Sequence, residues 1–168
     1  MSKQMEVTKK KIGGYTFYIK PFPAFTAANI SGELSQVLAP MLGSLAPLIG
    51  NANEEDVMDM DIESALPAFS NALSSLSGDK FEHLMTRLLV QYKNISVSGE
   101  ATDNEAEVLD MDLANEIFCG ELQDMFILCF EVVKVNYSGF FKKIAGRFGG
   151  LQGLTEKVMT QKNGESST

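Results

Sequence analysis

Residues 122–144, LQDMFILCFEVVKVNYSGFFKKI, constrain the fold of this chain more than any other stretch. On a helical wheel the polar side chains share one arc of roughly 100°, and nearly all other positions are apolar. The members of this polar arc are Gln123, Asp124, Glu131, Lys134, Ser138 and Lys142. The uncharged run over 125–130 is far shorter than the roughly 20 residues that span a bilayer. The pattern therefore predicts the central helix of a bundle, wrapped by other helices on most of its circumference.

Asn136 lies on the apolar side of this helix, outside the polar arc. Leaving a buried amide without a partner costs about 1–3 kcal/mol. We therefore expect Asn136 to hydrogen-bond to another element of the fold, and a role in binding a partner is the alternative.

The charge of the chain is concentrated in its middle. The formal net charge of −8 divides into +3 over residues 1–50, −15 over 51–132 and +4 over 133–168. The acidic middle and the lack of a basic stripe with interleaved aromatic residues argue against nucleic acid as a partner. The lysines near the N-terminus are not followed by the apolar core of a signal peptide, so we expect a cytoplasmic protein with no membrane contact.

A β-hairpin is predicted over residues 5–20, because Gly13 and Gly14 suit a two-residue turn and apolar residues alternate after it. A short strand over 95–97 can add to this hairpin. Helical spacing of apolar residues predicts helices over residues 24–38, 62–76, 81–92, 112–118 and 122–144. Pro40 is expected to end or kink the first of them. The expected fold is therefore mainly α: a compact helical bundle around one central buried helix, with an N-terminal β-hairpin.

The length of the chain, 168 residues, suits one ordinary hydrophobic core. We therefore expect a single domain over residues 1–160. The polar residues 161–168 have no apolar face to bury, so we expect them to form a disordered tail.

The sequence contains no recognisable constellation of catalytic or metal-binding side chains. His83 is the only histidine, has no partner at ligand spacing and is expected at the surface. The acidic stretch 51–63 lacks the glycine and the final acidic ligand of a calcium loop. The glycine-rich residues 146–150 lack the Lys and the Ser or Thr of a phosphate-binding loop. We therefore expect a protein that is not an enzyme and holds no metal and no cofactor.

An apolar surplus of nine Met and eleven Phe is the unusual feature of the composition. Five of the phenylalanines lie near prolines and glycines, and these are Phe22, Phe25, Phe140, Phe141 and Phe148. Two interpretations stay open. The aromatic residues pack the core, or they form an adaptable apolar groove for a helix of a partner protein.

Three phrases of the sequence resemble the tail assembly chaperones of long-tailed phages and prophages of Gram-positive bacteria. They are YTFYIKPFPAFTAANISGEL, KNISV and IFCGELQDMFILCFEVVKVNYSGFFKKIAGRFG. Residues 51–76 carry no part of the resemblance. The matching positions are Phe22, Pro23, Phe25, Asn29, Gly32 and Leu34 in the first phrase, and Phe118, Gly120, Val133, Asn136, Phe140, Phe141 and Phe148 in the last.

The resemblance implies a small, mainly helical, non-enzymatic protein of the host bacterial cytoplasm. Such a protein binds the tape measure protein, keeps it soluble and recruits tail tube subunits, and it is not expected in the mature virion. The partner-binding residues would be Phe22, Pro23, Phe25, Asn136, Phe140, Phe141 and Phe148, and a homo-oligomer stays open. The competing hypothesis is a permanent structural tail or connector subunit, whose Phe clusters are subunit interfaces. An enzyme for a small ligand would instead need a pocket with perturbed titratable groups.

Overall fold

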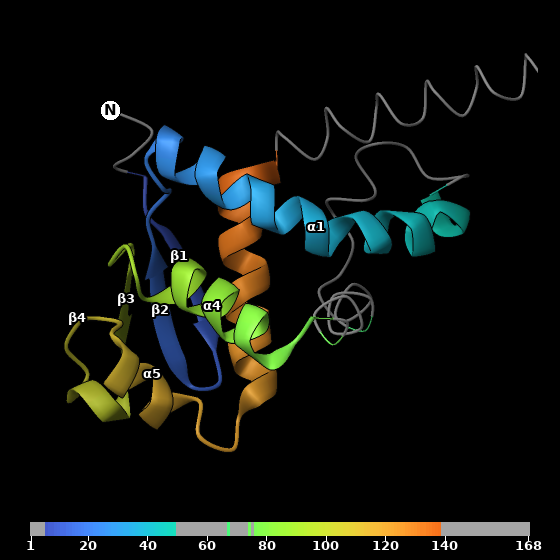
Figure 1. Ribbon diagram of the computed structural model, residues 1–168. Coiled ribbons are helices and arrows are strands. Elements are labelled where there is room, and N and C mark those ends of the chain that lie inside the picture. Colours follow the sequence, from blue (N-terminus) through green and yellow to red (C-terminus); the bar gives the residue numbers. More distant parts are fainter. Residues whose placement is uncertain (1–5, 50–66, 68–73, 75, 139–168) are drawn as a thin grey trace, which may run out of the picture.

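An antiparallel four-stranded sheet forms one layer of the fold, and helices cover one of its faces (Figure 1). The computed structural model describes residues 6–49, 67, 74 and 76–138, with the backbone alone over 37–49. The strands are β1 (Thr8–Ile12), β2 (Tyr15–Ile19), β3 (Ile95–Ser98) and β4 (Glu107–Val108), and they lie in the order β1-β2-β3-β4. The expectation of a mainly α bundle is therefore wrong, and the fold is α+β. The predicted hairpin forms two of the four strands of this sheet.

The turn between β1 and β2 depends on two glycines in the left-handed region. Gly13 has a φ of +56° and Gly14 has a φ of +84°, and residues other than glycine rarely adopt such values. The turn sets a register in which Ile12 lies opposite Tyr15 and Thr8 opposite Ile19. The predicted hairpin is confirmed.

β3 joins the hairpin from a distant part of the sequence. It pairs antiparallel with β2, so that Thr16 lies opposite Ser98 and Ile19 opposite Ile95. The backbone N–H of Lys20 extends this ladder by donating to the carbonyl of Asn94 (2.8 Å). The predicted short strand over 95–97 is therefore confirmed, and it makes β2 an interior strand.

The helices are α1 (Ala24–Ile49), α4 (Gly78–Leu89), α5 (Met111–Ile117) and a helix over residues 122–138, which we call the central helix. α1 continues through Pro40 to Ile49, so of the two predicted effects of this proline, an end or a kink of the helix, the end is wrong. α5 begins one residue before the predicted helix over 112–118, and the carboxylate of Asp110 caps it by accepting the N–H of Leu113 (2.9 Å). Gly120, with a φ of +79°, separates α5 from the central helix. Most of the helix predicted over 62–76 lies outside the described residues, as do the C-terminal residues from 139.

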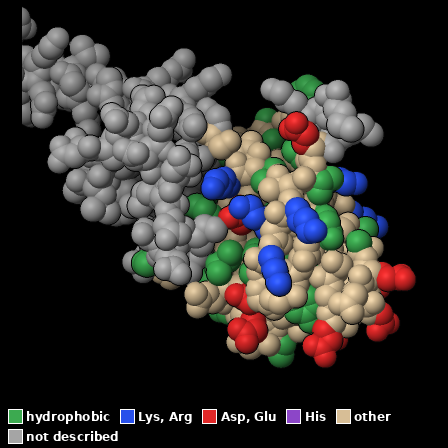
Figure 2. Space-filling view, turned by 180° about the vertical axis from the view of Figure 1, so that it is seen from behind, with side chains coloured by type: hydrophobic (Ala, Val, Ile, Leu, Met, Phe, Trp, Pro, Cys, Tyr) green, Lys and Arg blue, Asp and Glu red, His purple; other side chains and the backbone are tan. Residues whose placement is uncertain are grey.

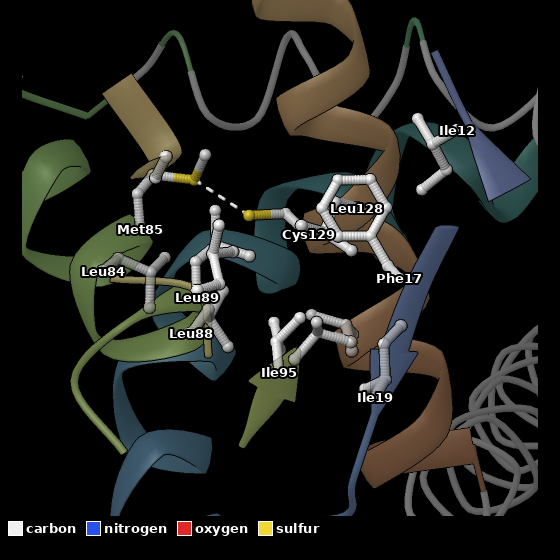
Figure 3. Close-up of a cluster of buried hydrophobic side chains, with 14 of the residues drawn as sticks. Ile12, Phe17, Ile19, Leu84, Met85, Leu88, Leu89, Ile95, Leu128 and Cys129 are labelled. Atoms are coloured by element: carbon white, nitrogen blue, oxygen red, sulfur yellow. Dashed lines mark hydrogen bonds between the residues drawn. The ribbon is translucent and has the colours of Figure 1, made fainter. Parts of the chain in front are cut away.

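The core lies between the inner face of the sheet, α4 and the central helix (Figure 3). Leu128, Cys129 and Val132 of the central helix are fully buried, as predicted, but the sheet covers them together with α4, so the prediction that helices wrap this helix is wrong. The side chains around them come from the sheet and from α4, and include Phe17, Ile19, Ile95, Leu84, Leu88 and Leu89. The thiol of Cys129 points at the sulfur of Met85 (3.2 Å). Among the described helices, none has the length and apolar character needed to cross a membrane.

Candidate functional site

The predicted partner-binding residues divide into a buried and an exposed group. Phe22 is buried, and its ring meets Tyr92 edge-on, with 5.7 Å between the ring centroids. Pro23 is exposed, and Phe25, in the first turn of α1, exposes 93% of its surface. The other three phenylalanines of the prediction, Phe140, Phe141 and Phe148, lie outside the described residues. Phe22 therefore builds the fold, whereas Phe25 is available to a partner.

Asn136 ties the segment before α1 to the central helix. Its Oδ1 accepts the backbone N–H of Phe22 (2.6 Å), and its Nδ2 donates to the carbonyl of Val132 (2.8 Å). The expectation that this amide hydrogen-bonds to another element is confirmed. Because Phe22 precedes α1 by two residues, this pair of bonds fixes where the helix begins.

We expect Asn136→Leu to lower the free energy of unfolding by about 1–2 kcal/mol, because the partly buried N–H of Phe22 loses its acceptor. Urea denaturation followed by circular dichroism measures the change. Asn115→Leu is the matched control, since Asn115 is exposed on α5. Equal stabilities of the two variants would contradict the role given to Asn136.

Arg87 on α4 forms polar contacts with α1. It is buried, and its guanidinium donates to Glu33 (2.5 Å), Asn29 (2.5 Å) and the hydroxyl of Tyr92 (3.0 Å). Asn29 and Glu33 are four residues apart, so both lie on one face of α1. The hydrogen bond to Tyr92 and the charge of Glu33 raise the pKa of Arg87, although burial opposes the rise. Sequence reasoning missed this cluster.

His83 lies at the rim of the Arg87 cluster. Its side chain is exposed, and its Nε2 is 3.6 Å from the carboxylate of Glu33. The predicted surface position of this histidine is confirmed.

Tyr137 of the central helix adds a third polar contact to α1. Its hydroxyl donates to the carbonyl of Ala27 (2.7 Å), and burial raises its pKa to about 12. Among the described side chains of α1, those of residues 24–36, Ile30 and Leu34 supply the fully buried apolar contacts. Polar groups of α4 and of the central helix thus determine how the first half of α1 is oriented.

The outer face of α1 carries almost no charge. Glu33 is the one charged residue between positions 21 and 53, and its carboxylate is bound by Arg87. The hydroxyls of Ser31 and Ser35 donate back to carbonyls of their own helix, at 2.6 and 2.7 Å. Phe25, Ala28 and Gly32 are exposed beside them. We call this surface, Phe25 with Ala28 and Gly32, the Phe25 face.

Glu131 on the central helix is a second buried charge, after Arg87 on α4. The helical pattern of the sequence predicts it in the exposed polar arc of the helix. Glu131 is 1% exposed, and its Oε2 lies 3.3 Å from Nζ of Lys10 on β1. The predicted polar arc is therefore wrong at this position. The other carboxylate oxygen, Oε1, is buried and has no hydrogen-bond partner in the part of the chain that the structure describes. Lys10 points inward because residues 8, 10 and 12 of β1 share the inner side of the strand.

No three His, Cys, Asp or Glu side chains gather at metal-binding distance within the described residues. Burial raises the pKa of the Cys129 thiol well above its ordinary value, which keeps this group protonated and unreactive. Cys119 is exposed.

Comparison with known protein families gives one match. The family model described as "Phage tail assembly chaperone protein, TAC" matches residues 13–149, which is more than half of the chain. The matched range contains the hairpin turn, the Phe25 face, Arg87 and Asn136. Comparisons with curated proteins and with solved structures give no significant match.

Proposed function

The chain belongs to the phage tail assembly chaperone family, and we propose from this that it binds the tape measure protein, keeps it soluble and recruits tail tube subunits during tail assembly. It acts by contact and without catalysis. Its place of action is the cytoplasm of the host bacterium, and it leaves the tail before the virion is complete.

The exposure of Phe25 is the observation that carries this proposal. A phenylalanine at 93% exposure keeps nearly its whole ring in water, which is unfavourable unless a partner covers it. Among the described residues the next most exposed large apolar side chain is Leu122, at 54%. An exposed apolar side chain on a helix is suited to pack against the apolar stripe of a client helix or into an apolar groove of the client.

The lack of charge around Phe25 supports the same partner class. A long helical client buries apolar stripes most readily on a surface without charges that must be desolvated. α1 also extends beyond the body of the fold, across the central helix (Figure 1).

Phe25→Ser tests the proposal. The variant is expected to melt like the parent, because the ring of Phe25 is exposed. Its binding to co-expressed tape measure protein is expected to weaken by about tenfold or more, since buried aromatic anchors contribute about 2 kcal/mol or more. Two measurements report the effect. One is the amount of soluble tape measure protein after co-expression, and the other is the amount that a pull-down with the variant recovers from the same lysate.

Met111→Ser is the matched control, because Met111 is an exposed apolar residue of α5, away from α1. A Phe25→Ser variant that retains the tape measure protein as well as Met111→Ser does would contradict the Phe25 face as the client site. The alternative function, a permanent tail or connector subunit, requires the chain in purified virions. Its presence there would replace the chaperone proposal.

A further inference from the structure

β4 leaves one edge of the sheet open. It is the last strand in the order β1-β2-β3-β4, so one of its sides has no neighbouring strand. Leu109, directly after β4, is fully buried, and its N–H donates to the carbonyl of Ile95 on β3 (2.9 Å). Along an antiparallel strand, successive residues direct their backbone groups alternately to one side and to the other. The N–H and the carbonyl of Val108 therefore point away from β3, to the open side.

Asp110 adds a second donor to this edge. Its backbone is extended (φ −106°, ψ −177°), so its N–H points to the same side as the N–H of Val108. Its carbonyl is already used, because it accepts the N–H of Ala114 (2.9 Å) at the start of α5. Within the described part of the chain, no residue forms a hydrogen bond with the N–H of Val108 or of Asp110. These groups are the ones that an added strand would bind.

The two side chains of β4 differ in kind and in direction. Glu107 lies opposite Val97, whose side chain is buried on the inner face of the sheet. Val108 lies opposite Ser96, on the outer face, which is the face away from the core. Both residues are exposed, Val108 to 47%. A neighbouring strand would therefore meet a carboxylate on one face and an apolar side chain on the other.

The surroundings of the edge are acidic. Glu105, Glu107, Asp110 and Asp112 are exposed, and no ion pair joins their carboxylates to another described residue. They belong to residues 94–133, which contain ten acidic residues and neither Lys nor Arg. Figure 1 places β4 and α5 at the lower end of the molecule, and Figure 2 shows Asp and Glu side chains along the lower rim in the view from behind.

We propose that β4 binds an extended segment of a partner protein, in which basic and apolar residues alternate, as a fifth strand of the sheet. The backbone of the segment bonds to the N–H and the carbonyl of Val108 and to the N–H of Asp110. Residues directly opposite each other on neighbouring strands have their side chains on the same face. A Lys or Arg of the segment opposite Glu107 thus places an apolar residue opposite Val108.

The charges favour this occupant over others. A nucleic acid backbone is repelled by the carboxylates around β4. An acidic strand is repelled as well, and a purely apolar strand leaves these carboxylates without a countercharge. β1, the other edge strand, exposes Lys9 and Lys11, so a basic segment is directed to β4 and not to β1. The proposal does not depend on the client proposed for the Phe25 face, which lies on α1.

A labelled peptide of about eight residues, in which Lys and Val alternate, tests the proposal against the full chain. Fluorescence anisotropy should give a dissociation constant below about 1 mM at low salt, and this constant should rise as salt screens the charges. Hydrogen exchange measured by NMR reports where the peptide binds. At saturating peptide the amide protons of Val108 and Asp110 should exchange about tenfold more slowly. The amide proton of Leu109, which is already bonded to Ile95, is the internal reference.

Three changes separate strand addition from attraction between charges. The first is the same peptide with an N-methyl group on the backbone of each Val, which keeps the charges but removes donors from the added strand. The second is Val108→Pro, which removes the N–H on the open side and no bond to β3. The third is Glu107→Lys, with Glu82→Lys on α4 as the matched control, since Glu82 is exposed away from the sheet.

Each of the three changes should raise the dissociation constant of the peptide about tenfold, whereas Glu82→Lys should leave it unchanged. Circular dichroism checks that the variants fold, and the N-methylated peptide tests the proposal without any change to the protein.

Four results would overturn the proposal. The first is a parent chain that does not bind the peptide at about 1 mM and low salt. The second is an N-methylated peptide that binds as tightly as the plain one, which would leave attraction between charges as the only interaction. The third is a slowing of amide exchange at β1 in place of Val108 and Asp110. The fourth is self-association of the parent in sedimentation velocity that Val108→Pro abolishes, which would make a second copy the occupant of the edge.

Discussion

Replacing Lys10 with Met is expected to lower the free energy of unfolding by about 3 kcal/mol, because the substitution leaves the carboxylate of Glu131 buried without its countercharge. The expected loss is below the upper end for fully buried pairs, since the side chain of Lys10 is 38% exposed and water screens part of the interaction. Among the described residues, Oε1 of Glu131 has no hydrogen-bond partner that would offset the lost ion pair. Urea denaturation followed by circular dichroism measures the change.

Lys11→Met is the matched control for this prediction. Lys11 is the next residue of β1 but points to the outer face, so its replacement should change stability by less than about 0.5 kcal/mol. The double variant Lys10→Met with Glu131→Leu should regain most of the stability, because an apolar pair replaces a buried ion pair at little cost. If Lys10→Met unfolds at the same urea concentration as Lys11→Met, the ion pair contributes nothing to the fold.

Arg87→Met is expected to cost about 3–4 kcal/mol, because it removes a buried cation together with the hydrogen bonds to Glu33, Asn29 and Tyr92. The loss should loosen α1, since Arg87 is the main polar contact between α4 and this helix. Hydrogen exchange of the α1 amides, compared with those of β2, reports the loosening separately from global unfolding.

Lys80→Met is the control on the same helix, because Lys80 is exposed in the first turn of α4. It should leave both the unfolding free energy and the exchange rates of α1 unchanged. An Arg87→Met variant with parental exchange in α1 would show that the remaining contacts, the burial of Ile30 and Leu34 and the hydrogen bond from Tyr137, hold the helix in place without Arg87.

The parts of the fold that could be predicted have local signals. Gly13 and Gly14 predict the hairpin turn, and apolar residues at helical spacing predict α4 and the central helix. β3 could be predicted as a short strand over 95–97, but the fourth strand, β4, could not. β4 has two residues, both exposed, so no alternation of buried and exposed side chains marks it. The fold was therefore predicted as mainly α with a hairpin, and not as α+β with a four-stranded sheet.

The candidate site was predictable to a smaller extent. Asn136 could be identified because an amide on an apolar helix face must find a partner, and the structure provides the N–H of Phe22. The pairing of Glu131 with Lys10 could not be foreseen, since 121 positions separate the two residues and each looks like an ordinary surface charge. The inward position of Lys10 on a strand was the available signal. For Phe22 and Phe25 the sequence left core and surface open, and the structure separates them.

The pairing of β2 with β3 has a consequence for the order in which the chain folds on the ribosome. Thr16 and Ser98 are opposite each other in the sheet but 82 positions apart in the sequence. At a synthesis rate of about 5–20 residues per second, β2 waits for roughly 4–16 s before its neighbour has been made. During that interval the hairpin has no sheet to join, and the apolar side of Phe17 and Ile19 faces water or whatever nascent or folded protein is nearby. The residues of the central helix, which finally cover that side, are added later still, so the native core of this chain is completed only near the end of translation of the matched region.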